Sequence, residues 1–122
     1  MASALIKSLQ IQKQSGKDVA TSVKVTIAVS FMARLIGLLS RSSLTDNQGL
    51  LLLPCGGIHT IGMRFTIDVV FLSADGRVLG YADNVKPNRL RFAPKGTKQV
   101  LEVAEGNRIR TGIHLDDCLL FV

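Results

Sequence analysis

The stretch "TIDVVFLSADGRV", Thr66 to Val78, decides how the chain folds. Every residue from Ile67 to Leu72 except Asp68 is apolar, so both alternating sets of side chains are apolar. That pattern is typical of a strand whose two faces are both covered. Asp75-Gly76 then supplies a hairpin turn, because glycine accepts the positive φ that such turns require. We therefore predict that this run begins with the central strand of a sheet and continues into a second strand.

Strand patterns continue on both sides of this stretch. The turn signal Ser15-Gly16-Lys17-Asp18 separates two apolar segments and predicts an N-terminal hairpin. Ser30 is a candidate N-cap for a short amphipathic helix with the sequence "FMARLIGLLSR". Further short strands are predicted at "LLLLP", "RVLGYADNV", "QVLEVAEG" and "DDCLLFV", with a turn or short helix at "NRIRTGI".

Length and composition set the number of domains. The chain has 122 residues and a hydrophobic content of 47%, which suits one compact core. Neither an internal repeat nor an interior linker interrupts it. We predict a single domain over residues 1–122, of the α+β, mainly β class, with about six or seven short strands and one or two short helices.

Positive charge is concentrated in one part of the sequence. The chain has 15 Lys plus Arg against 9 Asp plus Glu, a net charge of +6. Such a cluster can meet nucleic acid, an anionic lipid surface or an acidic partner through long-range attraction. A charge run of this kind is usually a solvated loop, and that interpretation is favoured over nucleic-acid binding because only Phe92 could stack on a base. The cluster is residues 86–98, which we call the basic segment; it has no acidic residue and contains Lys86, Arg89, Arg91, Lys95 and Lys98.

Apolar runs are too short for a membrane-spanning helix, which needs about 18 consecutive apolar residues. The N-terminal residues lack the pattern of a signal peptide, so the chain as written is expected in the cytoplasm, although relatives can be exported. Cys55 and Cys118 lie far apart and form no metal-knuckle spacing, so two reduced thiols are the default expectation.

The order "RLIGLLSRSSL", "GLLLLP", "IHTIGMRFTIDVVFLSADGRV", "VLEVAEG" and "RTGIHLDD" resembles the domain of unknown function 192 family over about residues 20–122. Residues 1–18 would then be an N-terminal strand or arm. The chain is similar to the branch with Cys-x-x-Ile-His-Thr before Met-Arg, because the Trp and Asn of common members are missing here. The resemblance implies a partly open, clam-like β fold without an assigned biochemical role. Relatives of this branch are loosely associated with envelope or pilus-type assemblies.

An arginine and an aspartate come together at the start of the predicted central strand. An extended chain places Arg64, Thr66 and Asp68 on one face. A buried carboxylate needs a partner, which here would be Arg64, backbone N–H groups or the polar segment nearby. Either the pair is a structural ion pair that fixes the strand, or Arg64 binds an anionic group while Asp68 orients it.

A cysteine and a histidine precede this pair. Cys55 and His59 flank a glycine pair, and together they could form a thiolate–imidazolium couple or contribute to a metal site. A metal would need further ligands, and the candidates show no recognisable metal spacing, so neither a metal nor a cofactor is predicted. These candidates are Asp68, Asp83, His114 and Asp117, of which His114 is expected at the surface and Asp117, with Asp116, in a turn.

These residues lead to one functional hypothesis and two alternatives. We predict a small binding module, leaning against an enzyme, that takes a small anionic ligand or a protein partner. One alternative is a Cys55/His59-dependent hydrolase or transferase, and the other is a protein-interaction component of an envelope or pilus-type assembly. The concave mouth of the module would be lined by Cys55, His59, Thr60, Met63, Arg64 and Asp68, with the basic segment at its rim.

Overall fold

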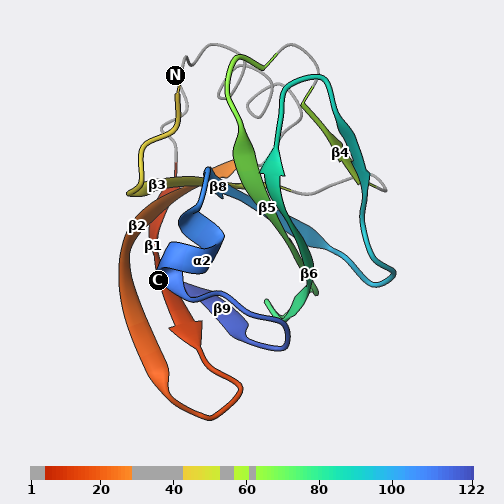
Figure 1. Cartoon of the computed structure of the whole chain (residues 1–122). Coiled ribbons are helices and arrows are strands. Elements are labelled where there is room, and N and C mark those ends of the chain that lie inside the picture. The colour runs from red at the N-terminus through yellow and green to blue at the C-terminus, as the bar shows by residue number, and fades with distance from the viewer. Residues whose placement is uncertain (1–4, 29–42, 53–56, 61–62) are drawn as a thin grey trace.

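The computed structural model describes residues 5–28, 43–52, 57–60 and 63–122. The described residues form nine strands and one short helix (Figure 1). In chain order these are β1 (Leu5–Gln12), β2 (Asp18–Ala28), β3 (Gln48–Leu52), β4 (Gly57–His59), β5 (Ile67–Leu72), β6 (Val78–Val85), β7 (Leu90–Phe92), β8 (Gln99–Ala104), α2 (Asn107–Thr111) and β9 (Cys118–Phe121). The prediction of a mainly β fold is confirmed.

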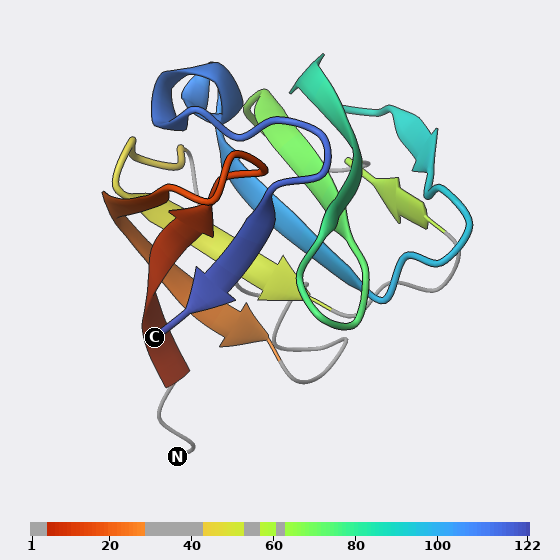
Figure 2. The same ribbon diagram turned by 90° about the horizontal axis from the view of Figure 1, so that it is seen from below.

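Seven strands form one curled sheet, in the order β6-β5-β8-β3-β2-β1-β9 (Figures 1 and 2). Strands β2 and β3 run parallel, and the other neighbours in this sheet are antiparallel. The remaining strands, β4 and β7, form a separate antiparallel pair, which we call the ribbon. The sheet is therefore mixed, and the short ribbon stands apart from it.

The predicted N-terminal hairpin is confirmed. Strands β1 and β2 pair from Leu5–Ile27 to Gln12–Asp18, with a register shift between Ser8 and Gln10. The Lys13 N–H donates to the Lys17 carbonyl across the turn, 2.7 Å away. Strand β1 lies between β2 and β9, so residues 5–12 are part of the sheet.

Strand β5 is buried along its whole length, as the sequence pattern predicts. Ile67, Val69 and Phe71 pack into one apolar cluster, while Val70 and Leu72 pack into a second cluster on the other face. The prediction that β5 is central in the sheet is wrong, because only β6 lies beyond it and β3 holds the middle place. An apolar pattern on both sides of a strand shows that both faces are buried, not that the strand is central. The two apolar clusters bury both faces of β5 even though it lies next to the edge strand.

The two outer strands of the sheet, β6 and β9, meet where β6 begins. An isolated bridge joins Arg77 to Cys118, and the Leu119 N–H donates to the Gly76 carbonyl at 2.8 Å. Gly76 has φ +89°, and a Cβ built there would lie 2.4 Å from the Leu119 carbonyl oxygen. Glycine is thus required twice, for the backbone angle and for the close approach of β9.

Three other expectations differ from the structure or lie outside it. The described residues contain nine strands rather than six or seven, since the ribbon adds two strands of three residues each. Part of the basic segment is strand β7, not only loop. The predicted helix "FMARLIGLLSR" lies outside the described residues. No helix of the described chain is long and apolar enough to cross a membrane.

Candidate functional site

The sequence predicts a site between Cys55 and Asp68, and the structure describes much of this segment. Cys55 lies outside the described residues. His59 ends β4 and is paired in register with Leu90 of β7, so the predicted site and the basic segment are joined through the ribbon. Residues far apart in the sequence thus become neighbours at the candidate site.

Thr60 attaches the basic segment to the rest of the fold. Its side chain is fully buried, and its hydroxyl donates to the Lys86 carbonyl at 2.6 Å and accepts the Arg89 N–H at 2.9 Å. Its backbone N–H donates to the Arg89 carbonyl, and its carbonyl accepts the Asn88 N–H. These contacts hold the backbone of residues 86–89 in one conformation and explain why a buried threonine sits here.

We expect Thr60→Val to loosen this attachment. Valine keeps the shape but leaves the Lys86 carbonyl and the Arg89 N–H without their partner, at about 1–3 kcal/mol for each group left unsatisfied. The free energy of unfolding should fall by about 2 kcal/mol, and the Arg89 amide should exchange faster in hydrogen exchange measured by NMR. The control, Thr60→Ser, keeps the hydroxyl and should change both quantities little; unchanged Arg89 exchange in the valine variant would contradict this role.

Met63 and Arg64 have opposite environments. Met63 is buried in the apolar cluster that also contains Ile58 of β4, so it packs rather than lines an open surface. Arg64 is exposed and makes no hydrogen bond or ion pair with another described residue. The Met63 N–H donates to the same Thr60 carbonyl that accepts the Asn88 N–H. The backbone that carries Arg64 therefore begins next to the basic segment.

Asp68 is satisfied by backbone groups. Its side chain is fully buried, and its two oxygens accept the Asn84 N–H at 2.9 Å and the Arg108 N–H at 3.0 Å. Of the partners that the sequence left open, backbone N–H groups are the ones found, and no ion pair with Arg64 forms. Asn84 has φ +55°, so the carboxylate also holds a residue of β6 that is in the left-handed conformation.

Arg108, which the sequence analysis did not single out, is buried and is the centre of a partly buried polar network. Its guanidinium donates to both oxygens of Asp83, at 2.8 and 2.6 Å, and to the Ile113 carbonyl at 3.1 Å. It also lies over the Tyr81 ring, 3.8 Å from the ring centre. The hydrogen bonds from Arg108 lower the pKa of Asp83, and the same bonds raise the pKa of Arg108. The network ties α2 to β6.

Asp117 joins the N-terminal hairpin to the last turn. It is buried, pairs with the Lys13 ammonium, and accepts the backbone N–H groups of Gln14 and His114. Burial opposes its ionisation, but Lys13 and the two N–H groups outweigh that effect and hold the pKa of Asp117 below its usual value. The residue is more than a turn former, whereas His114 is exposed as the sequence predicts.

The carboxylates considered as metal ligands have other partners. Asp68 accepts backbone N–H groups, Asp83 binds Arg108, and Asp117 binds Lys13. Among the residues that the structure describes, no three His, Cys, Asp or Glu side chains gather as a metal site would require. Cys118 is a free thiol there.

The basic segment forms an exposed, positively charged surface on the described chain. Lys86, Arg89, Lys95 and Lys98 are exposed, and Arg91 is half-buried. None of the five forms an ion pair with another described residue; the cations that do are Lys13, Arg108 and Arg110. Between them, β7 exposes two apolar side chains, Leu90 at 55% and Phe92 at 80%.

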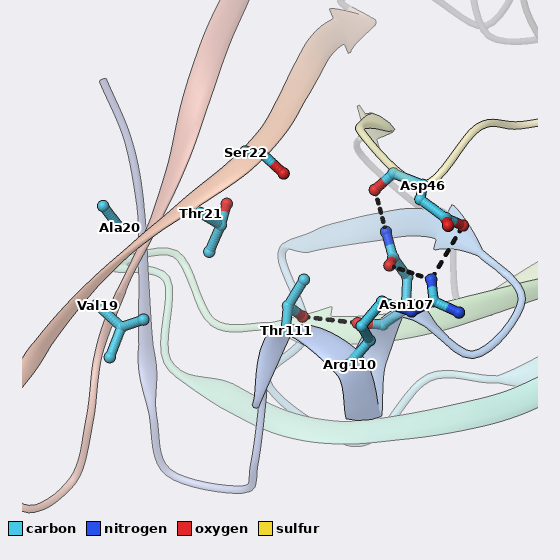
Figure 3. Close-up of a pocket in the computed structure, with 8 residues that line it drawn as sticks. All are labelled: Val19, Ala20, Thr21, Ser22, Asp46, Asn107, Arg110 and Thr111. Carbon is cyan, nitrogen blue, oxygen red and sulfur yellow. Dashed lines mark hydrogen bonds and ion pairs between the residues drawn. The ribbon is translucent and has the colours of Figure 1, made fainter.

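A surface hollow of about 290 Å³ lies elsewhere, between β2 and α2 (Figure 3). Its polar groups bond to one another: Asn107 donates to the Asp46 carbonyl, and Arg110 binds both the Asp46 carboxylate and the Asn107 side chain. No residue of the predicted site contributes to it. The hollow is lined by Val19, Ala20, Thr21, Ser22, Asp46, Asn107, Arg110 and Thr111.

Comparison with known proteins gives one family and similar folds. The family model DUF192, "Uncharacterized ACR", matches residues 11–121. No curated protein matches the chain. A solved structure from Sinorhizobium meliloti, of a protein provisionally described as a transcription regulator, has a TM-score of 0.83 at 20% identity and covers 99% of this chain and 97% of its own. A protein of unknown function from Novosphingobium aromaticivorans has a TM-score of 0.79 at 23% identity, with coverages of 98% and 93%. At these identities the likeness shows the fold alone.

Proposed function

Since the chain belongs to the DUF192 family, we propose that it is a binding module that recognises an anionic partner through one cationic face. This face consists of Arg64 and the basic segment. The observation that carries the proposal is that these six cations have no ion-pair partner among the described residues, while the segment itself has no acid. Like charges held together repel one another, and an anionic partner relieves that repulsion.

The scaffold supports this proposal by fixing the backbone under the charges. Thr60 bonds to residues 86 and 89, β4 pairs with β7, and the Lys98 N–H donates to the Leu72 carbonyl, so the basic segment has a defined backbone. The proposal keeps Arg64 from the predicted site as part of the face and gives Thr60, Met63 and Asp68 a structural part, while His59 pairs with Leu90 in the ribbon. The short junction between β9 and the start of β6, an isolated bridge with a few backbone hydrogen bonds, further supports a partly open, clam-like barrel as the form of the sheet.

Binding measurements with three anionic probes identify the class of anion that the face recognises. Because the Sinorhizobium protein is provisionally described as a transcription regulator, the probes should include a labelled single-stranded oligonucleotide besides anionic vesicles and a polyglutamate peptide. We expect at least one of these probes to bind at 50 mM NaCl and to bind much more weakly at 200 mM, since surface charges are screened over about 10 Å at 0.1 M salt.

Two matched variants test where the anion binds. Lys95→Ala with Lys98→Ala removes two cations from the basic segment, and Lys17→Ala with Lys24→Ala removes two exposed cations from the β1–β2 hairpin. Both variants lower the net charge equally. At about 1 kcal/mol per cation at an anionic surface, the first should raise Kd about 30-fold and the second only slightly. An equal loss in both variants, or no binding to any probe at low salt, would contradict the cationic face.

A further inference from the structure

Strand β7 presents two apolar side chains on one side of the ribbon. Leu90 and Phe92 are two residues apart and therefore point to the same side of the strand. Phe92 is paired with Gly57, which has no side chain, so nothing across the ribbon covers the ring. The ring is 80% exposed, the largest exposure among the large apolar side chains of the described chain. Such exposure of an aromatic ring indicates a contact surface.

The surroundings of this apolar pair are cationic. Arg89 and Arg91 adjoin Leu90 and Phe92 along the chain, with Arg91 starting from the opposite side of the strand, and three lysines complete the basic segment. The Arg91 guanidinium donates to the Leu90 carbonyl, which leaves its charge beside the apolar pair. Figure 2 shows the ribbon at the margin of the molecule, on the side away from β9 and the C-terminal end. The ribbon that carries the two apolar side chains is therefore placed to meet a flat surface before the main sheet does.

We propose that this side of the ribbon docks the protein on an anionic lipid surface, with Phe92 and Leu90 entering the headgroup region and the basic segment binding lipid phosphates. The inference rests on the cationic face proposed above and names its partner. Some proteins lie on an anionic bilayer without crossing it. They do so by inserting a few exposed apolar side chains while neighbouring Lys and Arg residues bind the headgroups. Arginine suits phosphate groups because its planar fork donates two parallel hydrogen bonds.

The composition of the patch favours lipid over the other anions. Single-stranded nucleic acid is bound by several stacked aromatics, whereas Phe92 is the one aromatic ring of this segment and Leu90 has no face for a base to stack on. A protein interface of ordinary size needs an apolar core of many residues on each partner, and a three-residue strand offers two. A lipid surface needs only a few apolar side chains in addition to positive charge.

Vesicle sedimentation with the full chain tests the inference at 100 mM NaCl. Vesicles of phosphatidylcholine with about a third phosphatidylglycerol should sediment the protein, and pure phosphatidylcholine should not. Leu90→Ala with Phe92→Ala should weaken this partitioning about tenfold or more, with oligonucleotide binding unchanged. The control, Ile109→Ala with Leu115→Ala, removes side chains of similar exposure, 65% and 51%, away from the ribbon and should change nothing. Circular dichroism confirms that each variant is folded.

Tryptophan fluorescence gives an independent readout of insertion. The chain has no tryptophan, so Phe92→Trp places a single reporter in the ribbon. Its emission should shift to shorter wavelength with the anionic vesicles and be quenched by brominated lipid. Binding to the oligonucleotide or polyglutamate with no blue shift on vesicles would overturn the lipid inference while the cationic face stands. Failure of all three probes to bind would overturn both.

Discussion

Gly76→Ala is expected to be among the most damaging single substitutions in this protein. The left-handed backbone at φ +89° costs an alanine about 1–2 kcal/mol. The added Cβ would also lie 2.4 Å from the Leu119 carbonyl oxygen, so β9 must move. That movement weakens the Leu119 N–H bond to Gly76 and the Val78 N–H bond to Asp117, at about 1 kcal/mol each. The free energy of unfolding in urea should fall by about 3 kcal/mol or more.

Gly16→Ala separates the two causes. Gly16 has a similar φ of +94°, but a Cβ there meets no atom within 4 Å. Its substitution should therefore cost only the backbone strain, about 1–2 kcal/mol. If both alanine variants lost the same free energy of unfolding, the close contact between the β6 hairpin and β9 would contribute nothing to stability.

Arg108→Ala should be equally damaging for an electrostatic reason. The substitution leaves the Asp83 carboxylate without its counter-ion, removes the donor to the Ile113 carbonyl and uncovers the Tyr81 ring. Breaking a fully buried ion pair by removing one partner typically costs about 3–5 kcal/mol, and since the Asp83 side chain is 26% exposed we expect about 3 kcal/mol here. Arg110→Ala, two residues further on, breaks the exposed pair with Asp46 and the hydrogen bond to the Asn107 side chain, and should cost only about 1 kcal/mol.

The pH dependence of stability provides a signature of the Arg108–Asp83 pair. The pKa of Asp83 is lowered in the folded protein, so its stabilisation is complete above the unfolded value of about 3.9 and is lost as the pH falls through the folded pKa. The stability difference between the native chain and Arg108→Ala should therefore shrink below about pH 4. A difference that stayed constant into acid would mean that the network contributes packing rather than charge.

Local features of the fold could be predicted from the sequence because local chemistry specifies them. The turns at Gly16 and Gly76 need positive φ, and the apolar run of β5 needs cover on both faces. The order of the strands could not be predicted in the same way. That β9 reaches both β1 and the start of β6 depends on pairings between distant segments, which no local pattern records.

The candidate site was predicted only in part, for a related reason. The position of Asp68 in an apolar strand predicted that its carboxylate needs hydrogen-bond donors. It did not predict that α2 would bring the Arg108 N–H to this carboxylate. Arg108 itself sits in "NRIRTGI", where it reads as an ordinary polar residue. Strand β7 could have been predicted from the alternation of apolar and basic residues between Arg89 and Phe92. The high positive charge of this segment instead favoured a loop.

An amide NMR titration of the labelled chain tests the cationic face most directly. Phosphatidylglycerol with short acyl chains, added below its micelle concentration, would be titrated while each backbone amide is followed. The proposal predicts saturable shifts at Arg64 and in residues 86–98, strongest near Leu90 and Phe92 and reduced by salt. Shifts confined to the hollow between β2 and α2, or spread evenly over the β1–β2 hairpin and the ribbon, would contradict it.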